Sequence, residues 1–222
     1  MIHKNYMTNS NITIKDFPKL ECPFKRKMEG SRYVVTPEID EDYRWVFEDE
    51  GVWATDKIDG TNVCVYIENG NIAEITNRKN LKNIFTVKKQ TRWEGACLEG
   101  IAKAIQKDWL KDFEDGYHYG ELVGDLINGN PHKMNGHLWA PLNYLRDHCR
   151  WHTWEANKYP KTFEAISEWF KEMPSLFNQK MKLPAIHAEG LVFYHPDGRM
   201  AKLRRDMFPW HTGKRHGEKD GN

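Results

Sequence analysis

The chain has 222 residues, which fits one large domain or two small ones. Its 33 Lys and Arg residues nearly balance 32 Asp and Glu residues, so any contact with nucleic acid must come from a local basic patch and not from overall charge. The sequence has neither a signal peptide nor an apolar run of membrane-spanning length, which predicts a soluble, cytoplasmic protein without a membrane partner. We also expect a monomer.

Residues 1–16 are polar, and we expect a flexible N-terminal segment there. The next clear pattern is an alternating, strand-like run that ends at Lys57 and resumes after a break. Asn69-Gly70 then predicts a tight hairpin turn between two strands. Apolar residues at helical spacing predict a helix over 94–109.

The second half of the chain mixes strands with one more helix. Thr162 can cap a helix that Pro174 ends, and "PDGR" at 196–199 is typical of a turn. Strands are predicted over 117–124, 187–195 and 200–205. Because βαβ alternation is absent, we expect an α+β fold of mainly antiparallel sheets with packed helices. The predicted domain covers 17–208, followed by a polar C-terminal tail over 209–222.

The cysteines of this chain are widely spaced and form no CxxC pair, which favours free thiols and a reducing compartment. Two histidines lie beside Cys149 in "HCRWH" at 148–152. No fourth metal ligand is evident nearby, so ordinary packing and surface histidines are favoured over a metal site.

The candidate chemistry starts at "KIDG", residues 57–60, where a charged break interrupts the strand pattern. Alone, this motif is weak, because a solvated turn has the same composition. Each of the charged residues that follow could likewise be an ordinary surface residue. Their joint occurrence in a fixed order favours a site, which contains Arg78, Glu121, Glu189, Lys202 and Arg204.

These residue types fit attack of an amine on phosphorus. A free lysine has a pKa of about 10.4, so Lys57 needs a lowered pKa to act as a nucleophile. We expect burial, Lys202, Arg204 and a bound metal to lower it. Carboxylates with retained waters usually hold Mg²⁺, which makes Glu189 the candidate metal ligand, supported by Asp59 and Glu121.

In this order the motifs resemble those of the covalent nucleotidyltransferase superfamily of polynucleotide ligases and mRNA capping enzymes. "KIDGTN", "TNRKNLKNIFT", "YGELVG", "AEGLVF" and "AKLR" are similar to its successive motifs. The opening "FPKLECPFKRK" and "GELVGDLINGNP" are most similar to small phage-type ATP-dependent RNA ligases. The resemblance implies a ligase-type adenylyltransferase domain, ATP-grasp-like, that uses ATP and Mg²⁺ (or Mn²⁺) and carries AMP on Lys57. Its implied partner is RNA with 5′-phosphate and 3′-hydroxyl ends, and DNA is also possible.

The resemblance also implies roles in nucleotide binding. Asp56 would read the adenine edge, and Gly60 would let the backbone approach the nucleotide. Arg78 would contact ribose or the acceptor phosphate, and Glu121 would contact ribose. Trp139 is the favoured candidate for stacking on the base, with Tyr144 as the other choice, although either could be a core residue.

The phosphate clamp implied by the resemblance contains Lys202 and Arg204. Ligases usually have lysine where Arg204 stands, and the two side chains differ in geometry. Only 18 residues follow Arg204, too few for the OB-fold that many relatives append. The expected fold therefore lacks an OB-fold. Either "PFKRK" at 23–27 serves its pyrophosphate-orienting role, or activity is limited to adenylate transfer.

Three alternatives remain open from the sequence. The enzyme readings include a DNA nick ligase and a GTP-using capping enzyme. The other class is a non-catalytic nucleic-acid-binding relative. Residues 78–92 hold six basic residues and no acidic one, which suits a groove that tracks phosphates, although a solvated loop has the same composition.

Overall fold

The structure is a computed structural model that describes residues 17–77, 83–86, 89, 91–155 and 161–213. The strands of the described part are β1 (Phe24–Glu29), β2 (Arg32–Ile39), β3 (Trp53–Lys57), β4 (Thr61–Glu68), β5 (Asn71–Asn77), β6 (Gly116–Gly124), β7 (His137–Pro141), β8 (Gly190–Tyr194) and β9 (Met200–Arg204). The helices are α1 (Trp45–Glu48), α2 (Arg92–Gln106), α3 (Leu142–His148), α4 (His152–Glu155), α5 (Phe163–Glu172) and α6 (Leu176–Met181).

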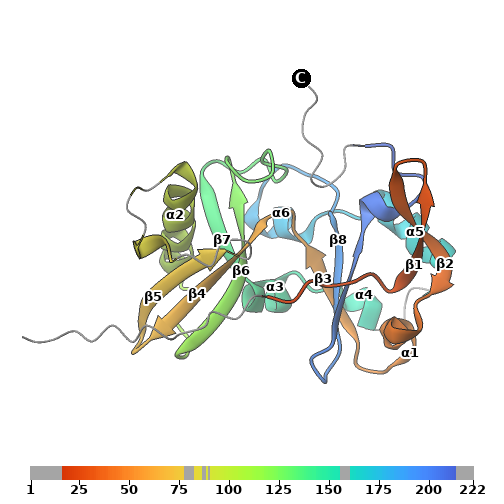
Figure 1. Cartoon of the computed structure of the whole chain (residues 1–222), viewed down its shortest axis with the longest axis horizontal. Helices are drawn as coiled ribbons and strands as arrows, with labels where there is room; N and C mark the ends of the chain where they lie inside the picture. Colours follow the sequence, from red (N-terminus) through yellow and green to blue (C-terminus); the bar gives the residue numbers. More distant parts are fainter. Residues whose placement is uncertain (1–16, 78–82, 87–88, 90, 156–160, 214–222) are drawn as a thin grey trace, which may run out of the picture.

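The larger sheet has the strand order β5-β4-β6-β7, and α2 covers one of its faces (Figure 1). Helix α2 begins after Thr91, whose side chain and Glu94 form a capping box. Small buried residues on α2 let the helix lie close to the sheet. At Gly100, for example, an added Cβ would come only 2.5 Å from the Leu122 side chain. Valines and isoleucines that alternate along β4 and β5 complete this core.

The smaller sheet has the order β3-β8-β9, and the β1-β2 hairpin lies beside it (Figure 1). A second core of aromatic and aliphatic side chains fills the space among this sheet, the hairpin and α5. Helix α5 is capped by Thr162, which accepts from the backbone N–H of Ala165.

A third apolar cluster lies between the two sheets and includes Ile58, Leu145 and Phe177. The segment 57–60 crosses here from β3 in one sheet to β4 in the other. Ile58 is only 2% exposed, so this apolar side chain anchors the crossing in the cluster. The charged break in the strand pattern is therefore a connection between two sheets.

The predicted α+β class is confirmed, since every strand pair in the described residues is antiparallel. Asn69 and Gly70 both have positive φ, as the hairpin turn requires. The three sheets of the described part are open and contain no closed barrel.

Two boundaries differ from the prediction. Helix α2 ends at Gln106 and not at 109, because Asp108 takes a left-handed φ of 57°. Strand β8 begins only at Gly190, so Glu189 precedes the strand. The prediction also missed β1, β2, β7, α1, α3, α4 and α6.

Other expectations concern thiols, metals and membranes. All four cysteines are buried free thiols. In the described ranges, no group of three or more His, Cys, Asp and Glu side chains is arranged to hold a metal ion. None of the helices in the described part is both long and apolar enough to cross a membrane.

Gly190 gives a test of the tight fit between β8 and β9. A Cβ there would come 2.0 Å from the carbonyl oxygen of Leu203, so Gly190→Ala must shift backbone and should lower the free energy of unfolding by about 1–3 kcal/mol. Gly95→Ala is the matched control: this exposed position in α2 has open space, and alanine should stabilise by about 0.5–1 kcal/mol. Urea unfolding measures both, and equal stability of the two variants would contradict the prediction.

Candidate active site

Lys57 is the last residue of β3, and its backbone pairs with Gly190, the first residue of β8. This register brings Lys57 next to Glu189, and the Lys57 Nζ lies 2.6 Å from the Glu189 Oε2. Their side chains are only 20% and 10% exposed. The predicted nucleophile and the predicted metal-ligand carboxylate therefore form a largely buried ion pair.

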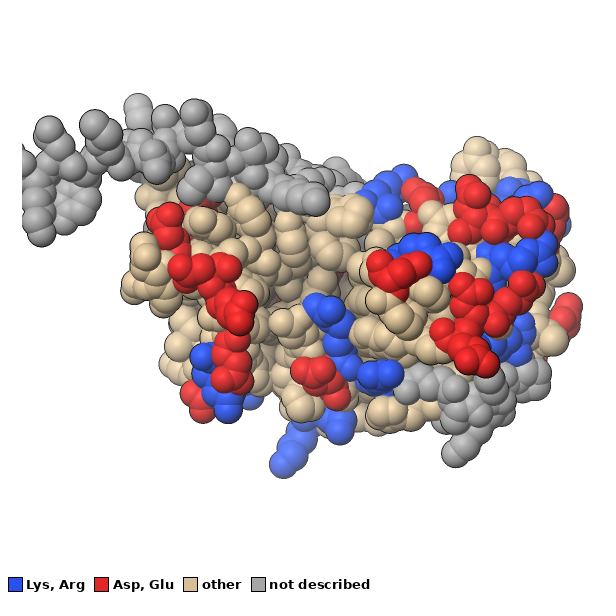
Figure 2. Space-filling model, turned by 90° about the horizontal axis from the view of Figure 1, so that it is seen from below, with Lys and Arg blue, Asp and Glu red and all other residues tan. Residues whose placement is uncertain are grey.

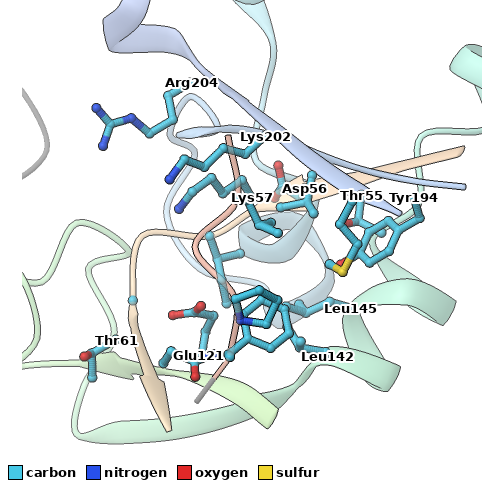
Figure 3. Close-up of a pocket in the computed structure, with 18 of the residues that line it drawn as sticks. Thr55, Asp56, Lys57, Thr61, Glu121, Leu142, Leu145, Tyr194, Lys202 and Arg204 are labelled. Atoms are coloured by element: carbon cyan, nitrogen blue, oxygen red, sulfur yellow. The ribbon is translucent and has the colours of Figure 1, made fainter. Parts of the chain in front are cut away.

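A cavity of about 330 Å³ opens beside Lys57 between the two sheets. Figure 3 shows the side chains of Lys57 and Lys202 side by side, pointing the same way, with Glu121 across the cavity from them. The cavity is lined by six of the predicted site residues, namely Asp56, Lys57, Gly60, Glu121, Lys202 and Arg204.

The charge state of Lys57 differs from the prediction. Burial lowers its pKa, but the carboxylates of Glu189, Glu121 and Asp59 outweigh burial and raise the pKa above its usual value. The expectation of a lowered pKa is therefore wrong for the protein without ligands. The pKa of Lys202 is lowered instead, first by burial and then by the neighbouring charges of Lys57 and Arg204.

Two carboxyl groups of the site hold their protons unusually tightly. Burial raises the pKa of Glu121 to about 7, while Lys57 lowers it and Glu189 raises it further. Burial also raises the pKa of Asp56 to about 7, against hydrogen bonds that lower it. Both groups therefore change charge near neutral pH.

Asp56 is 1% exposed and is held by the start of α6. Its Oδ2 accepts from the Ser175 hydroxyl at 2.9 Å and from the backbone N–H of Phe177 at 3.0 Å. Its other oxygen, Oδ1, is buried and accepts no hydrogen bond from the described residues. Asp56 lines the cavity, and Oδ1 is its carboxyl oxygen without a hydrogen-bond partner in the described residues.

A buried polar network, which the sequence did not reveal, fixes the other side of Lys57. The backbone N–H of Asp59 donates to the His132 Nε2 at 3.1 Å, so this nitrogen carries no proton. The His132 Nδ1 therefore carries the proton and donates to the Asn178 Oδ1 at 2.7 Å. Asn178 in turn donates its backbone N–H to the Ser175 hydroxyl, which links the network to Asp56.

Gly60 is required by the packing of the protein itself. A Cβ at this position would lie 2.7 Å from the carbonyl oxygen of Leu122 and 3.1 Å from the Glu121 side chain. The Asn128 amide holds the same turn, since it donates to the Asp59 Oδ1 at 2.7 Å and to the Gly60 carbonyl at 2.9 Å.

Arg204 lies on β9, two residues after Lys202, and both side chains line the cavity. The Arg204 guanidinium Nε lies 3.0 Å from the Asp206 Oδ1, so part of its charge is already paired. Residues 23–27 do not line the cavity. There Lys25 pairs with Glu38, and Arg26 pairs with Glu21.

Trp139 is a core residue in this structure, contrary to the predicted role in base stacking. It is fully buried beneath α2, and its indole N–H donates to the Val63 carbonyl at 3.1 Å. The aromatic rings that line the cavity belong to Phe17 and Tyr194. Tyr144 stacks on Trp109 with ring centroids 3.8 Å apart, away from the cavity lining. Arg78 lies outside the described residues.

The family model described as RNA ligase matches residues 50–208, most of the chain. The match includes Lys57, Glu121, Glu189 and Lys202. The chain belongs to the RNA ligase family.

Solved structures of Naegleria gruberi RNA ligase are similar to this chain. An apo form is 20% identical over 71% of this chain and 50% of that one, with a TM-score of 0.43. A form with pyrophosphate is 20% identical over 72% and 51%, also with 0.43. A form with ATP and Mn is 18% identical over 86% and 62%, with 0.46. The chain thus spans about half to three-fifths of those ligases. Among curated proteins, no sequence matches it.

A signal for the missed network was present in this RNA ligase sequence. "INGNPHKMNG" puts a lone histidine in a loop of Asn and Gly residues, where backbone groups need side-chain partners. Its partners Asp59 and Asn178 lie 73 and 46 residues away, so only the fold brings them together.

Asp56→Asn tests the raised pKa of Asp56. Between about pH 4 and 7 the folded protein keeps this proton and the unfolded chain releases it, so the carboxyl makes stability fall as pH rises. The variant lacks this carboxyl group and so escapes the loss. As pH rises from 4 to 7, the difference in free energy of unfolding between the variant and the natural protein should therefore shift in favour of the variant, by on the order of a few kcal/mol. Urea unfolding from pH 4 to 8 measures this. Exposed Asp112→Asn is the control, and parallel profiles of Asp56→Asn and the natural protein would refute the assignment.

His132→Ala tests the buried network. It leaves the Asp59 N–H and the Asn178 side chain without their partner and should lower the free energy of unfolding by about 1–3 kcal/mol. Amide hydrogen exchange at Asp59 should also become faster. The control is His148→Ala at an exposed position. Unchanged exchange at Asp59 in the His132 variant would contradict a role in fixing the turn.

Proposed function

We propose that this protein is an ATP-dependent RNA ligase that joins 5′-phosphate and 3′-hydroxyl RNA ends through a covalent Lys57–AMP intermediate. The observation that carries the proposal is the position of Lys57 at the cavity, paired with Glu189 and alongside Lys202. A buried lysine amine beside a second cation suits attack on a phosphoryl group.

In the first step, the Lys57 Nζ would attack the α-phosphorus of ATP. The new N–P bond forms as the bond from the α-phosphorus to the bridging oxygen breaks, and pyrophosphate leaves with that electron pair. Lys57 must first lose a proton, because its pKa is raised in the free protein. The Glu189 Oε2, 2.6 Å from the amine, is placed to accept it.

The other residues of the cavity would bind and orient the nucleotide. Lys202 and Arg204 would supply positive charge for its phosphates. Burial and the charges of Lys57 and Arg204 lower the pKa of Lys202, and a bound phosphate would favour its charged form. Leu142, Leu145 and Tyr194 offer a surface for the base, in the same cavity lining as Asp56, whose buried Oδ1 has no hydrogen-bond partner in the described residues.

The carboxylates fit a Mg²⁺ or Mn²⁺ ion that arrives with the nucleotide. The described residues contain no ready-made cage of three ligands, and Mg²⁺ is usually held by one or two carboxylates, waters and substrate phosphates. Glu189, supported by Glu121 and Asp59, would hold it. Bound there, the ion would neutralise phosphate charge and weaken the carboxylate field that keeps Lys57 protonated.

The next two steps would use the same cavity. The 5′-phosphate of an RNA strand attacks the AMP phosphorus and releases Lys57, which gives a strand activated by a pyrophosphate linkage. A 3′-hydroxyl then attacks the strand's own phosphorus, forms the phosphodiester and releases AMP. Both transfers need the positive charge of Lys202 near the reacting phosphates.

The proposal is tested by incubation with α-labelled ATP and Mg²⁺. The chain should become covalently labelled, and Lys57→Ala should abolish the label because it removes the attacking nitrogen. Lys103→Ala, a change on the outside of α2, is the matched control and should label normally. Addition of 5′-phosphorylated RNA should then remove the label as AMP passes to the strand.

Several outcomes would contradict this proposal. Labelling that survives Lys57→Ala would reject the nucleophile. Labelling by GTP alone would favour a capping-type guanylyltransferase, and transfer only to nicked DNA would favour a DNA ligase. RNA binding without any label would leave a non-catalytic nucleic-acid-binding protein.

A further inference from the structure

A second hollow of about 550 Å³ continues from the nucleotide cavity. We call it the aromatic groove, because its walls include Trp53, Phe113, Tyr117, Tyr119 and Tyr194. It shares Phe17, Leu142, Tyr194 and Met200 with the nucleotide cavity, so the two hollows meet. None of the functions considered above uses the groove.

The strands that build the nucleotide site also lead into this groove. Alternate residues of a strand lie on one face, so Lys57, Thr55 and Trp53 follow one another along β3. Thr55 and Lys57 line the nucleotide cavity, whereas Trp53 lines the groove.

Strand β6 repeats the pattern. Glu121 lines the nucleotide cavity, and Tyr119 and Tyr117, on the same face, line the groove. At about 3.3 Å per residue, the path from Glu121 to Tyr117 is roughly 13 Å long.

The groove combines flat rings with positive charge. Trp53 stacks on Tyr194 with ring centroids 4.2 Å apart, and the Arg150 guanidinium lies 4.6 Å from the Trp53 ring centroid. Arg146 lies in the groove wall itself, 6.0 Å from the Tyr194 ring centroid. The described residues that line the groove include no Asp or Glu.

The lining of the groove includes residues near the starts of β3 and β6 and in the turn between β8 and β9, and these segments lie on the lower side of Figure 1. Figure 2 views the molecule from that side. Lys and Arg side chains gather near the middle of this face, between the two halves, while most Asp and Glu lie toward its sides.

We propose that the aromatic groove binds single-stranded RNA, with bases of the strand next to the reacting end stacked on Tyr119 and Tyr117. This inference rests on the proposed function. Nucleobases stack on aromatic rings without a strict sequence requirement, and arginine beside the rings attracts the phosphates. The occupant must also reach Lys57, and the shared walls provide that continuity.

Tyr119→Leu is the central test, since it keeps apolar volume and removes the stacking face. Lysyl-adenylate formation, which needs no RNA, reports on the nucleotide site and should proceed. Binding of a 5′-phosphorylated single-stranded RNA, followed by fluorescence anisotropy, should weaken roughly tenfold, and AMP transfer at low RNA concentration should slow to match. Tyr119→Phe keeps the ring and should bind as the natural protein does.

Two further variants support the test. Arg146→Gln should lower the slope of log affinity against log salt by about 0.7, as expected for one lost phosphate contact to a single strand. Tyr33→Leu is the matched control, because Tyr33 is a 61% exposed tyrosine on β2 outside the groove. If Tyr119→Leu does not fold, Tyr117→Leu at the outer end of the groove replaces it, with thermal melting as the check.

The outcomes separate the two proposals. If the natural protein forms no lysyl adenylate, the proposed function fails, whereas RNA binding by the unmodified protein still tests the groove. If adenylation occurs but Tyr119→Leu, Tyr117→Leu and Arg146→Gln all bind RNA as tightly and with the same salt slope as the natural protein, the groove proposal is wrong. Equal weakening by Tyr33→Leu would overturn it as well.

Discussion

The pairing of β3 with β8 is the constraint on which the candidate site depends. It brings Lys57 opposite Gly190 and so sets the ion pair with Glu189 at 2.6 Å. Two largely buried charges are stable only together, because either one alone would lack compensation for its lost hydration. A shift of one residue in this register would turn Lys57 to the other face of the sheet. The register and the ion pair therefore stabilise each other.

The carboxylates around Lys57 explain its charge state. Glu189, Glu121 and Asp59 all act on its amine, and they keep it protonated despite burial. Burial, assisted by the charges of Glu189 and Asp59, raises the pKa of Glu121 to about 7 against the effect of Lys57. In the protein without ligands, negative charge thus exceeds what Lys57 alone can balance. In the proposed reaction, a nucleotide that enters with a divalent cation would change this balance, so electrostatics would couple amine deprotonation to nucleotide binding.

Local patterns in the sequence predicted much of this protein. Alternating apolar residues and Asn69-Gly70 gave the hairpin, since a positive φ at both turn positions is a property of those two residues. Ordered charged motifs gave the residues that the fold gathers around Lys57, although 132 residues separate it from Glu189. Family membership, and not periodicity, made that long-range grouping predictable.

The rest could not be predicted because it depends on tertiary packing. Tryptophan is a residue type suited to base stacking. However, β7 pairs with β6, and the Trp139 ring lies under α2 in the core. His132 and Asn178 gain their roles only where a loop and α6 meet the Lys57 turn. The pKa shift of Lys57 was predicted in the wrong direction, because the carboxylates of Glu189, Glu121 and Asp59 together outweigh the effect of burial.

Strands β3 and β6, which line both the nucleotide cavity and the aromatic groove, also constrain how a substrate could be aligned. Because β3 and β6 are hydrogen-bonded within their sheets, the distances from Lys57 to Trp53 and from Glu121 to Tyr119 are fixed by extended backbone. Other walls of the groove come from α3 and from the turn at 195–199, outside β3 and β6. In the proposed complex, β3 and β6 would therefore set the distance of a bound strand from Lys57. The side chains of α3 and of the turn would contribute to its affinity.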